Sequence, residues 1–243
     1  MIKLKNRIHF KTLSTESIRK TFKYNTDYIL NNLIPEETLE DLRRRESFVL
    51  VAFDEIFVRY PSCPDYYVSS YGRCISVRRG YPHLKKEPAD GSGHVVYKFY
   101  KKSSLMELNI SAQRAVADIY LPNFWPNLTR GQLETHHLHF TPGLNRWKDL
   151  FLCPVWIHAV MNQISEMKLL HDGDMIHAWP LDIYEMTGVS IDEIIKAISK
   201  DRIGTSGKFS LYSLGDYTIA VKYRKKPKKQ RYKGRRMGRG RNR

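Results

Sequence analysis

A group of histidines and an asparagine between residues 133 and 162 have the types and spacing that hydrolysis of a phosphodiester bond requires. His136 and His137 are adjacent, Asn145 follows a Pro-Gly pair, and His158 comes next. Such a reaction needs a base that activates water, a group that orients the base, and a cation that stabilises the leaving oxygen. Imidazoles serve as bases and as metal ligands, and a carboxamide can orient an imidazole. These four side chains therefore supply each part of a hydrolytic centre.

The sequence around them predicts a strand, a loop, a second strand and a helix. Pro154 is well placed to start the helix, which puts His158 one turn into it. Neighbouring strand residues point to opposite sides, so His136 and His137 approach a phosphate from different directions, as in-line displacement requires. Taken singly, a histidine is more often a hydrogen-bonded core residue, and a loop asparagine more often serves a turn. The complete set in this order favours hydrolysis.

In order and spacing, the segment resembles the HNH endonucleases. Their ββα-metal (His-Me finger) fold has a His or Asp-His pair, an Asn in the hairpin loop and a final His or Asn on the helix. The resemblance implies that His137 is the general base and that Asn145 orients its imidazole. It also implies that His136 and His158 bind one divalent cation. Two imidazole ligands suit Mn²⁺, Zn²⁺ or Ni²⁺ at least as well as Mg²⁺, so the cation stays open. His139 could touch phosphate, assist the base or merely pack, and it is not assigned as a ligand.

A second resemblance lies upstream, in the segment YYVSSYGRCISV at residues 66–77. It is similar to the nuclease-associated motif of phage and intron-encoded HNH enzymes, with Ser70 at the position where the motif has Asn. The strand pair and helix that follow also resemble the family, with Gln113 or Arg114 near its usual His-Arg. Together the two resemblances cover about residues 48–165.

Several basic residues of this upstream segment are expected to contact DNA phosphate: Arg73, Arg78 and Arg79. The alternative is an ordinary charged sheet edge. Beside the catalytic segment, Trp147 and Trp156 are expected to build the core of a small hairpin rather than to stack on bases.

The positive charge of the chain is concentrated at its C-terminal end. Of 41 Lys and Arg residues, 13 lie in residues 222–243 with no acidic residue, which leaves 28 basic and 25 acidic residues in the rest. The glycines of this segment oppose a helix. It is therefore expected to be a disordered basic arm that neutralises phosphates, with Arg224, Lys225 and Lys226 among its first contacts. The alternative is a solubilising tail.

Local signals predict further helices and strands. Residues 1–47 are mainly helical in pattern, and residues 48–100 contain short β-like runs. Ser111 is a candidate cap for the helix SAQRAVADIYL. Near the C-terminus, PLDIYEMT ends at Gly188, and VSIDEIIKAISK begins with capping-box spacing. Residues 208–222 are expected to form a closing β-hairpin.

The two helices between residues 180 and 200 are typical of a helix-turn-helix. The second would present Lys196 and Lys200 on one face for DNA. A packed helical pair without DNA contacts is an equally good interpretation, because Asp192 and Glu193 at the helix start would repel phosphate.

These signals predict an α+β, modular protein with five parts. The parts are a helical segment (1–47), a β-rich nuclease-associated DNA-binding module (48–126), a ββα-metal catalytic module (127–170), a helix-turn-helix-like module with a β-hairpin (171–221) and the basic disordered tail (222–243).

The cysteines and the absence of long apolar runs bound the setting in which the chain works. Cys63, Cys74 and Cys153 are odd in number and outside any CxxC spacing, which favours buried thiols over disulfides or a zinc site. No run approaches the roughly 18 apolar residues of a membrane span, and the start lacks the pattern of a secretory signal. We expect a cytoplasmic protein, in a bacterial host, with no membrane partner.

The combined expectation is a metal-dependent endonuclease that hydrolyses DNA, with duplex DNA as the expected substrate, in a phage or mobile-element setting such as homing. It needs one divalent cation and no small-molecule cofactor. Nicking and double-strand cutting both stay open, as do packaging and restriction roles. The alternative from another class is a non-catalytic, basic nucleic-acid-binding protein whose hairpin is only structural.

Overall fold

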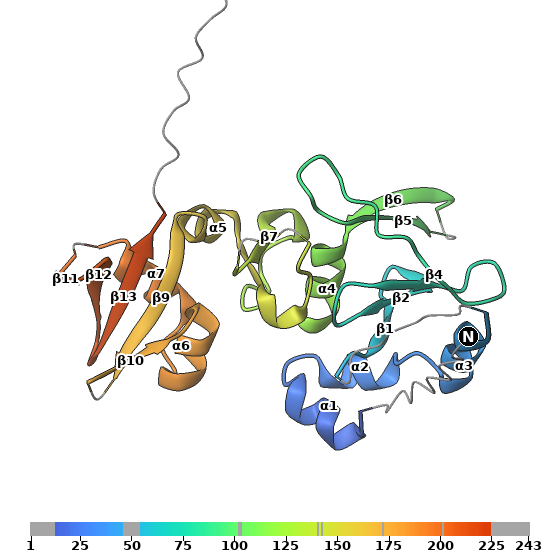
Figure 1. Ribbon diagram of the computed structural model, residues 1–243, viewed down its shortest axis with the longest axis horizontal. Helices are drawn as coiled ribbons and strands as arrows, with labels where there is room; N and C mark the ends of the chain where they lie inside the picture. Colours follow the sequence, from blue (N-terminus) through green and yellow to red (C-terminus); the bar gives the residue numbers. More distant parts are fainter. Residues whose placement is uncertain are drawn as a thin grey trace, which may run out of the picture.

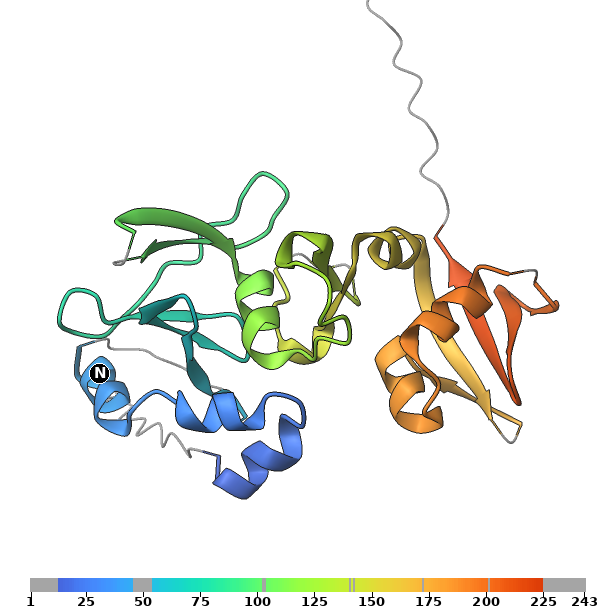
Figure 2. The same ribbon diagram turned by 180° about the vertical axis from the view of Figure 1, so that it is seen from behind.

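The computed structural model describes residues 13–45, 54–101, 104–139, 141, 143–171, 173–200 and 202–224. Within them the chain is a mixed α+β protein built on small antiparallel sheets. The molecule is elongated, with an N-terminal part, a small central hairpin and a C-terminal sheet that follow one another along its length (Figures 1 and 2). The predicted α+β class is confirmed at this level.

Three short helices open the described chain, as the helical pattern predicts. They are α1 (Thr15–Thr21), α2 (Thr26–Asn31) and α3 (Glu36–Arg45). The side chain of Ser14 caps α1, and Pro35 directly precedes α3. Acidic residues stand in the first turn of α3 and arginines in its last, which suits the helix dipole. The predicted run FVLVAF, residues 48–53, lies outside the described residues.

The upstream β-like runs form a four-stranded sheet and a separate hairpin. The sheet has the order β1 (Phe57–Tyr60), β2 (Cys63–Ser69), β3 (Cys74–Ser76) and β4 (His83–Leu84). The hairpin pairs β5 (Val96–Lys101) with β6 (Met106–Ser111). The segment that resembles the nuclease-associated motif therefore makes β2, its turn and β3, which pair in antiparallel register.

Helix α4 (Ala112–Tyr120) lies at the centre of the first core, and the predicted cap Ser111 accepts a hydrogen bond from the backbone of its first turn. Its apolar face is fully buried with residues of α1, α2 and the four-stranded sheet. The hydroxyl of Tyr120 donates to a carbonyl of that sheet, at 2.8 Å from Val68 O. On its other side, Arg114 Nη1 donates to Leu133 O at 2.7 Å. Helix α4 thereby joins the upstream sheet to the central hairpin.

The central hairpin consists of β7 (Leu133–His137), β8 (Leu150–Pro154) and the following helix α5 (Val155–Met161). The two strands pair antiparallel, with Leu133 opposite Pro154 and His137 opposite Leu150. Pro154 is the N-cap residue of α5, and His158 lies in the middle of that helix. The predicted order of strand, loop, strand and helix is thus the order observed.

The C-terminal part is a five-stranded antiparallel sheet covered by two helices. Its strands run in the order β10 (Asp174–His177), β9 (Ile164–His171), β13 (Tyr217–Tyr223), β12 (Phe209–Leu214) and β11 (Gly204–Ser206). Helices α6 (Pro180–Thr187) and α7 (Ile191–Ile198) bury their apolar residues with this sheet in a second core. The left-handed Gly188 ends α6, and a capping box opens α7, both as predicted. The hairpin expected at residues 208–222 corresponds to β12 and β13.

Two boundaries differ from the sequence prediction. A boundary at residue 170 would cut β9, which pairs along its length with β13. The basic arm was expected from residue 222, but Lys222 and Tyr223 belong to β13. Both differences arise because the pairing of β9 with β13 joins residues far apart in the sequence, which no local pattern reveals. Beyond Arg224, the arm lies outside the described residues.

The three cysteines are free and buried, as expected. Among the helices of the described ranges, none has both the length and the apolar character needed to cross a bilayer.

A buried ion pair closes the upstream sheet. The Glu55 side chain is 2% exposed and that of Arg73 is 20% exposed. Arg73 Nε donates to Glu55 Oε1 at 2.9 Å, and Nη2 donates to the second carboxylate oxygen. This two-point contact uses the donor groups that were expected to grip DNA phosphate. Arg73 is therefore a structural cation in this fold, and the expectation of a free, DNA-facing guanidinium does not fit its surroundings.

Replacing Arg73 by Ala should destabilise the protein strongly, because it removes the two hydrogen bonds that the guanidinium donates to a buried carboxylate. We expect the free energy of unfolding to fall by about 3–5 kcal/mol, measured by urea denaturation. Arg79→Ala, at an exposed arginine of the same segment, should change stability by no more than about 0.5 kcal/mol. Equal small losses in both variants would contradict a structural role for Arg73.

Candidate active site

The predicted catalytic residues gather on two sides of the short strand β7. The ring of His136 lies 5.2 Å from that of His158 on α5. The neighbouring His137 instead contacts Asn145, which lies in the loop between β7 and β8. Strand alternation sends successive side chains to opposite faces, so this division follows from the adjacency of the two histidines. The structure therefore forms two pairs, His136 with His158 and His137 with Asn145.

The His137–Asn145 pair is buried and defines which ring nitrogen is available for chemistry. The two side chains meet at 3.2 Å between Nε2 and Oδ1. A carboxamide oxygen only accepts hydrogen bonds, so this contact puts the proton on Nε2 and leaves the lone pair on Nδ1. Burial lowers the pKa of His137, while the bond to Asn145 opposes that shift. A neutral imidazole with a defined free lone pair is the form that a general base requires.

The turn between β2 and β3 holds Asn145 in place through close backbone contacts. Gly72 has a φ of +86°, and a Cβ on it would lie 2.4 Å from Asn145 Cβ. Only glycine permits both this conformation and this approach. Next to it, Trp147 N donates to Ser70 O at 2.9 Å, and Tyr97 OH donates to Gly72 O at 3.1 Å. The upstream motif thus holds the loop between β7 and β8, which carries Asn145, in place.

Side chains of the same turn make further contacts with this loop. Arg146 Nη2 donates to Tyr71 OH at 2.7 Å, and its guanidinium carbon lies 4.4 Å from the centre of the Tyr71 ring. The Tyr71 hydroxyl in turn contacts Asp54. A chain of contacts therefore runs from Asp54 through Tyr71 to the residue that follows Asn145. No local pattern in the sequence points to Arg146 as a partner of Tyr71, because the two residues are 75 positions apart.

The second pair, His136 and His158, has the character of a metal site. His136 is buried, and its pKa falls to about 3, mainly through burial and also through repulsion from His158 and His137. A histidine that stays neutral offers a lone pair, which is the form that binds metal ions. The two rings are tilted by 73° at 5.2 Å between their centres. A nitrogen-to-metal distance of about 2.0–2.1 Å allows two rings at such a separation to share one ion.

Glu134 joins this pair and was missed by the sequence analysis. It stands two residues before His136 on β7, and its Oε2 atom is in direct contact with Nδ1 of His158. A carboxylate only accepts, so the contact places the proton on Nδ1 and leaves Nε2 of His158 for a ligand. Carboxylate partners of this kind orient metal-binding histidines and raise their basicity. The sequence did contain a signal for Glu134, because residues two apart in a strand point to the same face and Glu134 therefore shares a face with His136.

Two imidazoles alone do not complete a coordination sphere. Within the described ranges, no group of three or more His, Cys, Asp or Glu residues is arranged to hold an ion. A catalytic ion leaves positions open for water and substrate oxygens, so a two-residue protein set is sufficient for a site that is completed by phosphate. The residues present therefore fit one divalent cation held by His136 and His158.

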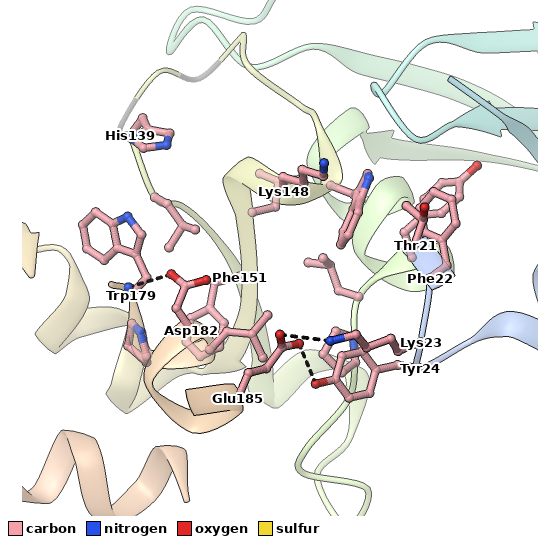
Figure 3. A pocket seen from close by; sticks show the side chains of 18 of the residues that line it. Thr21, Phe22, Lys23, Tyr24, His139, Lys148, Phe151, Trp179, Asp182 and Glu185 are labelled. Carbon is pink, nitrogen blue, oxygen red and sulfur yellow. Dashed lines mark hydrogen bonds and ion pairs between the residues drawn. The ribbon is translucent and has the colours of Figure 1, made fainter. Parts of the chain in front are cut away.

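His139 lies away from both pairs. Its Nε2 atom is 3.4 Å from Asp149 Oδ1, and its ring is 6.4 Å from that of Trp179. It lines a cavity of about 530 Å³ between α1, the hairpin and α6. Figure 3 shows His139 and Trp179 on one side of this cavity, and Thr21 and Phe22 on the other. The His139 side chain is 52% exposed, so it lies at the rim of this cavity and is not a core residue.

Ionic contacts close one end of that cavity. Lys23 Nζ lies 3.2 Å from Glu185 Oε2, and Tyr24 OH donates to Glu185 Oε1 at 3.2 Å (Figure 3). These contacts join the segment after α1 to α6. They add a link between the N-terminal and C-terminal parts beside the central hairpin.

The remaining predicted DNA-contacting residues have different surroundings. Arg78 and Arg79 are exposed and line a cavity of about 380 Å³ together with Lys85, which the sequence analysis did not single out. The guanidinium carbon of Arg78 lies 3.9 Å from the Tyr100 ring centre. Three basic side chains around one hollow suit an anionic group such as a phosphate.

The predicted basic residues of the C-terminal part are also exposed. Lys196 lies on α7, and Lys200 follows the end of that helix. Arg224 N donates to Gln163 O at 2.8 Å, directly after α5, and its charge helps to lower the pKa of His136. The described start of the basic arm is thus joined by its backbone to the residue pair that follows α5, the helix that carries His158. Lys225 and Lys226 lie outside the described residues.

The two tryptophans of the hairpin differ in burial. Trp147 packs on Phe22 of the first core, with ring centres 5.0 Å apart. Trp156 is 53% exposed, so the expectation that it helps to build the core is wrong. The reason is its place on α5, whose buried face is formed by Ile157 and Met161.

Replacing Gly72 by Ala should displace Asn145, because an added Cβ meets Asn145 Cβ at 2.4 Å in a strained conformation. We expect the hydrogen bond to His137 to be lost, seen by NMR as loss of the proton preference for Nε2 of His137. Gly80→Ala is the matched control: Gly80 has a φ of +82°, and nothing lies within 4 Å of an added Cβ. An unchanged His137 tautomer in Gly72→Ala would contradict the role of this turn in holding Asn145 in place.

Replacing Glu134 by Ala should weaken metal binding by about 10- to 100-fold, because His158 loses the group that orients it. Calorimetric titration with Mn²⁺ measures this directly, without any need for catalytic activity. Glu166→Ala, at a lysine-paired glutamate on β9, serves as the control and should leave affinity unchanged. Equal affinity in wild type and Glu134→Ala would refute the assignment.

Comparisons with known proteins give limited information. No protein-family model matches the chain, and no curated protein matches it. Among solved structures, it is similar to one described as showing DNA binding and cleavage by the HNH homing endonuclease I-HmuI. That match covers 70% of this chain and 99% of the other, at 16% identity and a TM-score of 0.34. A TM-score this low does not establish a shared fold.

Proposed function

We propose that this chain is an HNH-type, metal-dependent endonuclease that hydrolyses DNA phosphodiester bonds, of the kind found in phages and mobile elements. The observation that carries the proposal is the division of β7 into two functional pairs. His137 with Asn145 makes a base with a defined tautomer, and His136, whose pKa is lowered by burial, lies beside His158 as the second proposed metal ligand. In this proposal the hairpin and α5 form a ββα-metal module.

The base side of the reaction follows from the hydrogen bond to Asn145. Because Nε2 of His137 donates to Asn145, Nδ1 accepts the proton of the attacking water. Burial lowers the pKa of His137 and so opposes proton uptake, and the hydrogen bond to Asn145 offsets part of this loss of basicity. Asn145 continues to accept from Nε2 when His137 carries a positive charge, which keeps the ring in one orientation during the reaction.

The other side of β7 faces the leaving group. His136 and His158 would hold the divalent cation, which when bound would stabilise the charge that develops on the leaving 3′ oxygen. Glu134 orients His158 for this purpose. Water activation on one face of β7 and leaving-group stabilisation on the other suit an in-line displacement at one phosphate.

DNA is the polyanion that best suits the charge of the chain. The basic arm carries much of a formal net charge of +16, and its residue Arg224 donates a backbone hydrogen bond to Gln163, just after the helix that carries His158. The hollow with Arg78, Arg79 and Lys85 offers a second phosphate contact in the upstream module. We propose that these regions bind the DNA backbone in a salt-dependent way and so place a phosphate over β7.

For α6 and α7 we propose a supporting role in DNA binding, in the manner of a helix-turn-helix-like module. Lys196 and Lys200 are exposed, whereas the apolar face of α7 packs on the C-terminal sheet. The N-terminal turn of α7 carries Asp192 and Glu193, and Asp192 accepts a hydrogen bond from Trp125. Contact with DNA is therefore better served by the C-terminal end of α7 than by its beginning.

Cleavage of supercoiled plasmid with Mg²⁺ or Mn²⁺ tests the proposal. Wild type should nick or linearise the plasmid, and His137→Ala should be slower by about 10²- to 10⁴-fold, because the general base is gone. His171→Ala is the control, since that histidine packs on Tyr217 in the C-terminal sheet and should have no effect. If wild type shifts the plasmid in a gel but does not cut it with Mg²⁺, Mn²⁺, Zn²⁺ or Ni²⁺, a non-catalytic nucleic-acid-binding protein would be favoured instead.

A further inference from the structure

His94 lies against the face of the proposed base. Its ring centre is 5.3 Å from that of His137, and the ring planes differ by only 28°, so the two imidazoles are stacked. His94 comes from the upstream module, just before β5, and not from the hairpin. The sequence analysis did not single it out. His137 is thus held at its edge by Asn145 and on its face by His94.

The loop that carries His94 is built to hold this residue through its backbone. Asp90 Oδ1 accepts from His94 N at 3.0 Å and from Ser92 N at 2.8 Å. Asp90 N donates to His94 O at 2.8 Å, and Ala89 bridges to Val95. None of these bonds uses the imidazole of His94. The ring is therefore free to serve another purpose, and its replacement leaves the loop's own bonds intact.

The polar atoms of the ring do not explain its position. Nδ1 of His94 is buried and has no hydrogen-bond partner among the described residues. Burying a polar atom without a partner costs free energy, so a ring held only by packing would be better served by an apolar side chain. The contact that the ring does make is the stack on His137. A purpose connected with His137 accounts for the geometry.

We propose that His94 is a positioning residue for the reaction, one that fixes the ring plane of His137 by stacking on it. The proposal rests on the proposed function. Aromatic rings attract each other when their centres lie about 4.5–7 Å apart. The stack, with centres 5.3 Å apart, lies in that range. The stack orients the proposed base and does not contact substrate, so its loss should lower turnover more than substrate binding.

Two substitutions separate the ring face from its nitrogen atoms. His94→Ala removes the face and should lower kcat by about 2- to 30-fold with an unchanged KM, because the base loses its fixed orientation, whereas His94→Phe keeps a face and should stay within about 2-fold of wild type. His171→Ala is again the control. A kcat in His94→Ala equal to wild type would overturn the proposal, and so would a loss in His94→Phe as large as that in His94→Ala.

A measurement without catalysis separates this proposal from the proposed function. NMR of the His137 ring reports its surroundings, because a stacked aromatic ring shifts the signals of its neighbour. In His94→Ala the His137 Cε1–H signal should move downfield as the stack is lost, with circular dichroism unchanged. An unmoved signal would overturn the contact itself. If wild type cuts no DNA, the proposed function fails and the catalytic role of His94 fails with it, whereas a moved signal would still support the stack.

Discussion

The backbone of Gly72 lies against the side chain of Asn145, and most of the site depends on that approach. The turn between β2 and β3 can come this close only because it carries no Cβ at a positive φ. Asn145 in turn fixes His137 by the 3.2 Å contact between Oδ1 and Nε2. Through Asn145, the orientation of the proposed base is thus set by Gly72, which lies in the upstream module. This accounts for the upstream segment as a support of the site, beyond any contact with DNA.

Burial then gives the two faces of β7 their different chemistry. His136 is kept neutral by burial and by its histidine neighbours, which suits a metal ligand at any ordinary pH. His137 is also buried, but Asn145 on its edge favours the protonated form that a base must reach. The same strand therefore holds one imidazole that should remain unprotonated and one that can take a proton. Strand alternation alone keeps these two environments apart.

Sequence patterns succeeded where the cause of a structure is local. The cap at Ser111, the left-handed Gly188 and the capping box at Ser190 each act within one turn, and all three are present. The order of strand, loop, strand and helix was also predicted, since it follows from short runs and Pro154. The pairings of His136 with His158 and of His137 with Asn145 agree with the expected geometry, although their roles stay proposals.

What the sequence could not predict depends on contacts between distant segments. Strands β9 and β10 were missed, because the sheet that contains them is completed by β13. Arg73 was expected at the DNA, but its partner Glu55 is 18 positions away in the chain and became visible only in the fold. The contacts of His94 with His137 and of Gly72 with Asn145 likewise arise only because upstream loops pack on the hairpin. Tertiary contacts of this kind do not produce a periodic pattern of residue types in a single sequence.

The central claim is that His136 and His158 share one cation on the face of β7 opposite the proposed base. Anomalous diffraction from crystals soaked in Mn²⁺ tests it most directly. The account predicts one strong peak between the two rings, within bonding distance of a nitrogen of each. A peak elsewhere, or none between these rings at saturating Mn²⁺, would contradict it.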